Sequence, residues 1–236
     1  MALPRIFLLR ASVQTVLCIL CFNLGYMIAF YNYSDETPTP KDQTLEVEGA
    51  FSRQTLANLR HHKALLFAAI VSSPRNSERR QAIRDTWLNI PRSLRQDVLP
   101  AFIIGTQNLS PSEKDIVQQE IDTHKDILAL SIEDSFSQLT QKVLSTFQFA
   151  DKFLNFKYLL KVDDDSFVRL DALLDELKNS NFNDRLYWGF FDGRAPVIRK
   201  EGNKWKEDKP YLLCDKYIPY ALGGGYVLSR DLVGNM

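Results

Sequence analysis

An apolar run that ends in three consecutive acids constrains the fold of this chain more than any other feature. The run Tyr158–Val162 leads directly into Asp163, Asp164 and Asp165. Such a run is typical of a buried strand that ends at the acids. Open α/β sheets bind ligands outside the carboxyl ends of their strands, and carboxylates clustered there hold hard divalent metals. Three acids at a strand end also occur in solvated turns, so other parts of the chain must distinguish a site from a turn.

Further apolar runs alternate with amphipathic segments from residue 63 onward. Strands separated by helical stretches predict an α/β fold, with a mainly parallel sheet flanked by helices. The segment Ser110-Pro111-Ser112-Glu113 is a capping box with proline at the first helical position, and it predicts the start of a helix. Strands are expected at 65–71, 98–104, 127–132, 158–162 and 187–191. Helices are expected at 77–87, with Ser77 as the N-cap, and from Ser110, Leu139 and Leu170.

The N-terminal part of the chain differs in composition from the rest. Residues 11–30 contain no charged side chain, and 20 such residues span about 30 Å as a helix, the thickness of a bilayer core. Arg5 and Arg10 precede the segment, and Asp35 and Glu36 follow it, so the positive-inside rule leaves the N-terminus in the cytosol. A cleaved signal peptide is the rival interpretation, but no small-residue cleavage site follows the run.

These features divide the chain into four expected parts. Residues 1–10 are a cytosolic tail, and residues 11–31 are a signal-anchor transmembrane helix. Residues 32–62 are polar and proline-bearing, which is typical of a stem. Residues 63–236 are expected to form the lumenal catalytic domain.

Charge and cysteine content narrow the class of protein. Lysine plus arginine and aspartate plus glutamate each number 29, so the net charge is zero, and no basic stripe suggests nucleic-acid binding. Glycosylation sequons begin at Asn32 and Asn108, and they have meaning only in a secretory compartment. Cys18 and Cys21 fall in the expected membrane span, which leaves Cys214 as a lumenal cysteine without a partner in this chain.

An arginine-rich segment with Arg79, Arg80 and Arg84 follows the first expected strand. Ser72 comes at the strand end, and Arg80 and Arg84 are i, i+4 neighbours on the next helix. Two guanidinium groups near a helix N-terminus are suited to binding a phosphate. A solvated basic face, paired with Glu78 and Asp85 of the same helix, is the alternative interpretation.

Two further segments are candidates for ligand binding: the residues after the third expected strand, and a run of glycines near residue 224. Asp134 ends the strand, and Lys142 lies in the next helix, so the carboxylate could accept from a base edge and the lysine could meet a phosphate. Local capping by Asp134 is the alternative. Gly223–Gly225 would let a backbone approach a ligand closely, although glycines are also ordinary turn residues.

Five motifs between about residues 65 and 233 occur together in one order. They are Arg80-x-x-x-Arg84-x-Thr86-Trp87, Phe102-Ile103-Ile104-Gly105, Asp134-x-Phe136-x-x-Leu139-Thr140-x-Lys142, Lys161-x-Asp163-Asp164-Asp165-x-Phe167 and Gly223-x-Gly225-Tyr226-Val227. Together they resemble the inverting β1,3-glycosyltransferases of the Golgi. The resemblance implies a GT-A-like fold and a single-pass type II protein of the Golgi membrane with a lumenal catalytic domain.

The resemblance also implies a reaction. Galactose would pass from UDP-galactose, in β1,3 linkage and with inversion, to a β-galactoside of the glycosaminoglycan linkage region on proteoglycan core proteins. Mn²⁺ would be the cofactor, held by Asp163 and Asp165. The residues implied to line the nucleotide site are Ser72, Arg80, Arg84, Asp134, Lys142, Asp163 and Asp164.

The family's catalytic base is expected in a Glu-Asp-Val-type motif downstream of the glycine segment, beyond Met236, and a late metal-binding histidine is expected there too. The catalytic residue is therefore unknown, and the chain is expected to be a C-terminally incomplete fragment that transfers galactose poorly. A naturally short, catalytically silent isoform is one alternative, and a sister β1,3-N-acetylhexosaminyltransferase is another. A lumenal calcium-binding or lectin module is a third, but the acids lack EF-hand spacing.

Overall fold

The computed structural model describes residues 63–180, 182, 185–207 and 216–236. The predicted cytosolic tail, signal-anchor helix and stem lie outside these residues, as does Cys214. Within the described residues, no helix combines the length and the apolar character that crossing a membrane requires.

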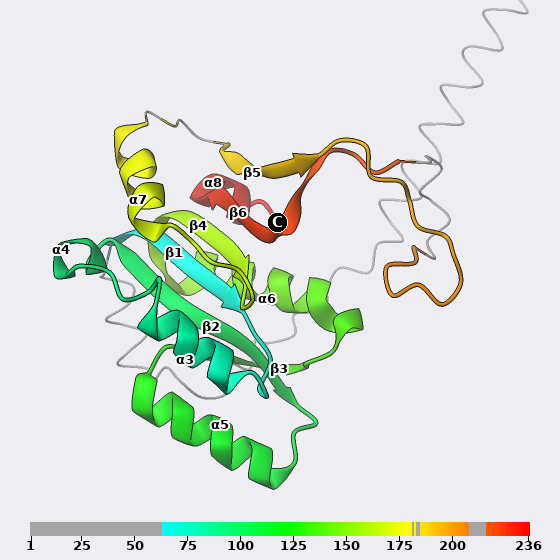
Figure 1. Ribbon diagram of the computed structural model, residues 1–236, viewed down its shortest axis with the longest axis horizontal. Helices are drawn as coiled ribbons and strands as arrows, with labels where there is room; N and C mark the ends of the chain where they lie inside the picture. Colours follow the sequence, from blue (N-terminus) through cyan, green and yellow to red (C-terminus); the bar gives the residue numbers. More distant parts are fainter. Residues whose placement is uncertain (1–62, 181, 183–184, 208–215) are drawn as a thin grey trace, which may run out of the picture. The chain divides into compact units, whose positions relative to one another are not determined.

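The described residues form a six-stranded mixed sheet with the order β3-β2-β1-β4-β6-β5 (Figure 1). Neighbours among β1 to β4 run parallel, whereas β6 is antiparallel to both β4 and β5. The predicted α/β class with a mainly parallel sheet is thereby confirmed. The strands are β1 (Lys63–Val71), β2 (Val98–Gln107), β3 (Ile127–Glu133), β4 (Asn155–Asp163), β5 (Tyr187–Asp192) and β6 (Tyr220–Ser229).

Strand order reverses between β1 and β4. From β1 the chain builds β2 and β3 on one side, and then returns to place β4 on the other side of β1. The two strands end level with each other, because Val71 pairs with Asp163 and the Asp164 amide donates to the Val71 carbonyl at 3.1 Å. Ligands of open α/β sheets bind at such a switch point, so the acids stand where the topology favours a site.

Helices cover both faces of the sheet (Figure 1). Buried residues of α3, α5 and α7, such as Ile83, Val117 and Leu174, share one core, and residues of α6 and α8, such as Phe147 and Val233, share the other. The helices are α3 (Ser77–Asp85), α4 (Arg92–Arg95), α5 (Pro111–His124), η1 (Phe136–Gln138), α6 (Leu139–Phe153), α7 (Leu170–Asn179) and α8 (Arg230–Val233).

Two local predictions about helix starts have different outcomes. The capping box is confirmed, because Ser110 and Glu113 exchange the expected hydrogen bonds at the start of α5. The expected cap at Ser77 is wrong, because Asn76 occupies the N-cap position and Ser77 is already helical. Asn76 makes no side-chain cap bond, and its amide instead donates to Asp164 at 2.8 Å. The Asn76 side chain therefore contacts the acidic segment and does not cap α3.

The glycine segment lies inside a strand that the sequence pattern did not predict. Gly223–Gly225 belong to β6, where Gly225 pairs with Val162 of β4. The run of glycines lacks the alternating apolar side chains that mark a strand, so pairing with β4 and β5 supplies the structure. The interpretation of these glycines as turn residues is therefore wrong.

Gly105 of β2 permits a close approach to β3. A Cβ atom at this position would lie 2.5 Å from the Ile132 carbonyl oxygen and 3.0 Å from the Asp134 amide nitrogen. We expect Gly105→Ala to lower the free energy of unfolding by about 1–3 kcal/mol, because backbone atoms must move. Urea unfolding would measure the loss, with Gly193→Ala as the control, since a Cβ there meets nothing closer than 3.7 Å. Equal unfolding midpoints for the two variants would contradict the expectation.

Candidate functional site

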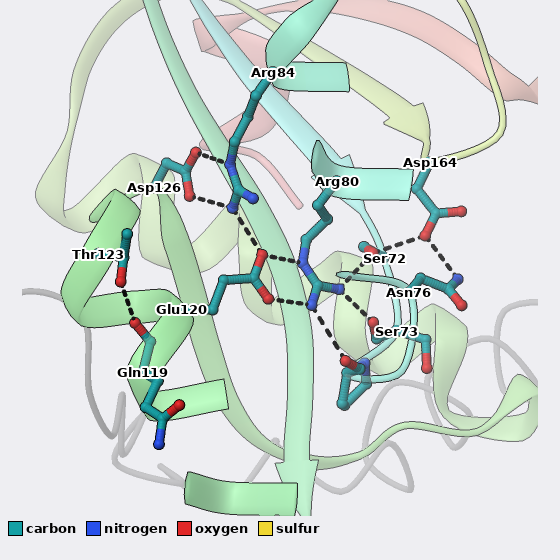
Figure 2. A network of polar contacts seen from close by, with 11 residues as sticks. Ser72, Ser73, Asn76, Arg80, Arg84, Gln119, Glu120, Thr123, Asp126 and Asp164 are labelled. Carbon is teal, nitrogen blue, oxygen red and sulfur yellow. Dashed lines mark hydrogen bonds and ion pairs between the residues drawn. The ribbon is translucent and has the colours of Figure 1, made fainter. Parts of the chain in front are cut away.

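Asp164 ties the end of β4 to the loop between β1 and α3. Its carboxylate accepts hydrogen bonds from the Ser72 hydroxyl at 2.7 Å and the Asn76 side-chain amide at 2.8 Å (Figure 2). It also accepts from the Arg79 guanidinium at 3.0 Å. Burial raises the pKa of the Asp164 carboxyl, but the bonds from Asn76, Ser72 and Arg79 outweigh it and hold that pKa below its ordinary value. With a side chain only 8% exposed, Asp164 is an ionised anchor inside the protein.

The acids on either side of this anchor are open to solvent. Asp163 is 37% exposed and accepts a hydrogen bond from buried Lys161, whose ammonium also donates to the Gly223 carbonyl at 2.7 Å. Asp165 is 68% exposed, with its carboxylate 3.9 Å from Arg79. A Cβ on Gly223 would come within 3.8 Å of Asp163 Oδ2, so the glycine leaves space beside that oxygen. The structure thus separates one anchoring acid from two accessible ones.

A buried lysine joins the ends of β1 and β3. Lys142 of α6 donates from Nζ to the Ser72 carbonyl at 2.6 Å and to Asp134 at 2.7 Å, and Asp134 also accepts from the Gly105 amide at 2.8 Å. Burial lowers the pKa of the Lys142 ammonium, although the charge of Asp134 opposes the shift. Asp134 therefore partners a lysine and a strand amide. It caps neither of the helices that follow it, so the local-capping alternative is wrong.

Arg80 is fully buried beneath the loop that follows β1. Two of its N–H groups, on Nε and Nη2, donate to Glu120 at 2.9 and 2.6 Å (Figure 2). The remaining three donate to the Ser72 hydroxyl at 3.0 Å and to the carbonyls of Ser73 and Pro74. All five N–H groups of the guanidinium are thus directed at protein acceptors. Arg80 braces the loop, and its expected contact with a nucleotide stays a prediction.

Arg84 lies one turn farther along α3, and its hydrogen-bond partners are not the acids at the end of β4. Its Nε and Nη2 both donate to Asp126 at 2.8 Å, and Nη2 also donates to Glu120 at 2.9 Å. Asp126 directly precedes β3, so Arg84 is held at the amino end of that strand. The alternative in which both arginines form a solvated face paired within their own helix is wrong. Their partners come from α5 and from the residues after it.

The structure therefore connects Ser72, Asp134, Lys142 and Asp164 directly, and adds Arg80 through Ser72. Sequence reasoning assigned no site role to four further members of the site, which are Asn76, Arg79, Glu120 and Lys161. Lys161 carried a signal, because a single charge in an apolar run is seldom buried without a partner. Glu120 carried none, since it lies 40 residues from Arg80.

The predicted metal ligands are consistent with a hard cation. Among residues 63–180, 182, 185–207 and 216–236, no group of three or more His, Cys, Asp or Glu side chains is placed to hold a metal. Asp163 and Asp165 nevertheless present exposed carboxylate oxygens, which suit Mn²⁺. Two carboxylates fit an ion that takes its other ligands from water and phosphate, as Mg²⁺ usually does.

The pairing of Glu120 predicts a pH-dependent stability. Burial raises the pKa of Glu120, but the hydrogen bonds and charges of Arg80 and Arg84 outweigh it and lower that pKa. A lowered pKa adds stability above the unfolded value of about 4.3, and this stability is lost as pH falls through the folded value. We expect Glu120→Gln to cost most near neutral pH and progressively less below about pH 4.3. Urea unfolding of the wild type and of Glu120→Gln, from neutral pH to below about pH 4.3, measures this dependence. A difference in unfolding free energy that stays constant with pH would contradict the expectation.

The chain is similar in sequence to known glycosyltransferases. The family model described as galactosyltransferase matches residues 78–236. Mouse (Mus musculus) β-1,3-galactosyltransferase 6 is 46% identical over 175 residues, 72% of this chain and 53% of that protein. A lactosylceramide 1,3-N-acetyl-β-D-glucosaminyltransferase B of Xenopus laevis is 28% identical over 229 residues, 91% of this chain and 60% of that protein. The chain thus spans about half the length of the mouse relative. On the family match and the mouse similarity together, the chain belongs to the galactosyltransferase family.

Proposed function

We propose that this chain is a β1,3-galactosyltransferase that uses UDP-galactose and inverts the anomeric centre of the donor. The observation that carries the proposal is the pair of exposed acids, Asp163 and Asp165, fixed at the switch point by the buried anchor Asp164. The proposed acceptor is a β-galactoside of the glycosaminoglycan linkage region on proteoglycan core proteins. It follows from the family resemblance and from the similarity to mouse β-1,3-galactosyltransferase 6.

The donor half of the reaction needs charge placed against a diphosphate. Asp163 and Asp165 would hold Mn²⁺, which would supply positive charge against the departing diphosphate. Arg79 is 54% exposed beside Asp165, so its guanidinium is available to a phosphate oxygen. Asp164 accepts a hydrogen bond from Nη1 of Arg79 at 3.0 Å, which limits the freedom of that side chain before any ligand binds.

Other site residues make hydrogen bonds within the protein that hold the site together. Lys142 and Asp134 hold the ends of β1, β2 and β3 together, while Ser72 and Asp164 join β1 to β4. A site of this kind depends on side chains whose positions are locked by supporting hydrogen bonds. Inversion also needs a carboxylate to deprotonate the acceptor hydroxyl. That base is expected in the Glu-Asp-Val-type motif downstream, so no described residue is proposed for the role.

The proposal includes a location. A single-pass type II protein of the Golgi membrane, with its catalytic domain in the lumen, would meet UDP-galactose and growing proteoglycans there. The charge pattern around residues 11–30 supports this orientation. An epitope after Met236, protected from protease in sealed microsomes, would support it, and a protease-sensitive epitope would reverse the topology.

Binding and turnover on the full chain test the proposal. We expect UDP to bind by calorimetry in the presence of Mn²⁺ and to lose most of its affinity in EDTA. UDP-galactose should displace UDP more effectively than UDP-N-acetylglucosamine. The opposite order would favour the sister N-acetylglucosaminyltransferase, to which the frog relative also points. Absence of UDP binding would overturn the proposal.

Turnover separates an enzyme from a silent isoform. Galactose transfer to a β-galactosyl-xylose acceptor, with a β1,3 linkage in the product, is the positive result. If UDP binds without turnover, and turnover is seen in a longer protein that carries a Glu-Asp-Val-type motif, the base would be assigned to that motif. UDP binding without turnover in both forms would favour the silent isoform.

A further inference from the structure

Glu120 of α5 faces two arginines of α3, Arg80 and Arg84 (Figure 2). Its carboxylate, in a side chain 11% exposed, accepts from Nε and Nη2 of Arg80 and from Nη2 of Arg84. Two parallel N–H···O bonds between one carboxylate and one guanidinium fix the plane of the guanidinium. The orientation of Arg80 is therefore set by a residue 40 positions away on another helix.

The fixed plane of Arg80 determines where its other donors point. These donors reach the Ser73 and Pro74 carbonyls and the Ser72 hydroxyl, all in one loop. A hydroxyl group has one proton and two lone pairs. Because Ser72 Oγ accepts from Arg80 at 3.0 Å, its proton is free for Asp164, whose carboxylate lies 2.7 Å away. A chain of directional hydrogen bonds thus runs from α5 to the middle acid of the switch point.

We propose that Glu120 is a positioning residue for the nucleotide-sugar site. It acts through Arg80 on the loop Ser72–Pro74, and through the Ser72 hydroxyl on Asp164 and the two exposed acids beside it. This inference rests on the proposed function. It assigns a role to Glu120 that is separate from any contact with donor, metal or acceptor.

Structural and positioning roles can be separated because they respond differently to paired replacement. Removing one partner of a buried ion pair leaves an uncompensated charge and destabilises the fold, whereas replacing both partners by apolar residues is often neutral. The double variant Arg80→Met with Glu120→Leu keeps the packing volume and leaves Arg84 paired with Asp126. The double variant also removes the Arg80 hydrogen bond that directs the Ser72 hydroxyl. A positioning role therefore predicts weaker UDP binding, whereas a purely structural role predicts little change in UDP binding.

The experiment measures UDP affinity by calorimetry with Mn²⁺ on the full chain, together with thermal unfolding. We expect the double variant to unfold within a few degrees of the wild type and to bind UDP at least about tenfold more weakly. Glu120→Asp retains the charge with a shorter reach, and we expect its affinity to fall between those of Glu120→Gln and the wild type. Asp115→Asn, an exposed acid of the same helix, is the matched control and should bind UDP normally.

A stable double variant with wild-type UDP affinity would overturn the proposal. If the double variant does not fold, UDP affinity equal to wild type in both Glu120→Asp and Glu120→Gln would overturn it as well. Hydrogen exchange separates this failure from failure of the proposed function. The Ser72 and Asn76 amides donate to the Ile103 and Ser73 carbonyls at 3.0 and 2.9 Å, so both report on the loop without any ligand. Faster exchange of these two backbone amides in the folded variants, with unchanged exchange in the β1 core, supports the positioning role of Glu120 even if UDP never binds. Unchanged exchange of the two amides contradicts that role.

Discussion

Replacing Lys142 by methionine should lower the free energy of unfolding by about 3–5 kcal/mol. The ammonium is buried and bridges the Ser72 carbonyl and the Asp134 carboxylate, at 2.6 and 2.7 Å. Methionine keeps most of the side-chain volume but leaves the Asp134 carboxylate with the neutral Gly105 amide as a donor in place of a cation. An ionised carboxylate that loses its buried cation carries a desolvation penalty without compensation.

Urea unfolding near neutral pH measures this loss, with Lys114→Met as the control. Lys114 lies on the exposed surface of α5, where a substitution usually changes stability by less than about 0.5 kcal/mol. The Asp134→Asn variant adds a second check, because it removes the charge that needs Lys142. The double variant should then lose less than the sum of the two single losses. Additive losses would show that the two groups do not act as a pair.

Replacing Asp165 by asparagine should abolish metal-dependent UDP binding while leaving the fold intact. The side chain is 68% exposed, and its nearest charged partner is Arg79 at 3.9 Å, so little stability depends on it. As a proposed Mn²⁺ ligand, however, it would be one of the two carboxylates proposed to hold the ion. Loss of a supporting residue around a metal costs about 10- to 100-fold in affinity, so loss of a ligand should cost at least about 100-fold.

The neighbouring acid provides the matched comparison. Asp164→Asn should destabilise the fold, because three donors converge on a carboxylate that is 8% exposed. Calorimetric titration of UDP with and without Mn²⁺, beside thermal unfolding, would distinguish the two variants. Unchanged UDP affinity in a folded Asp165→Asn protein would remove Asp165 from the metal site. An unchanged melting temperature in Asp164→Asn would show that the middle acid is no anchor.

Local patterns in the sequence determined much of the fold. Apolar runs predicted β1 to β5 near their observed bounds. Burial on both faces leaves a continuous apolar signature in β1 to β4, whereas β5 is a largely exposed edge strand that its aromatic residues mark. The capping box at Ser110 specified the start of α5 by contacts within four residues. Asp163–Asp165 at the end of an apolar run correctly indicated where the strand stops and where polar groups gather.

Tertiary structure decided what each of these polar groups does. The sequence presents three equivalent acids, and only the approach of the β1–α3 loop makes Asp164 the anchor and leaves its neighbours exposed. Arg80 and Arg84 have acids on their own helix, yet they bond to Glu120 and Asp126 from another part of the chain. The physical reason is range: secondary structure follows from neighbouring residues, whereas the partner of a buried charge is whichever group the packing of distant elements brings within hydrogen-bond distance.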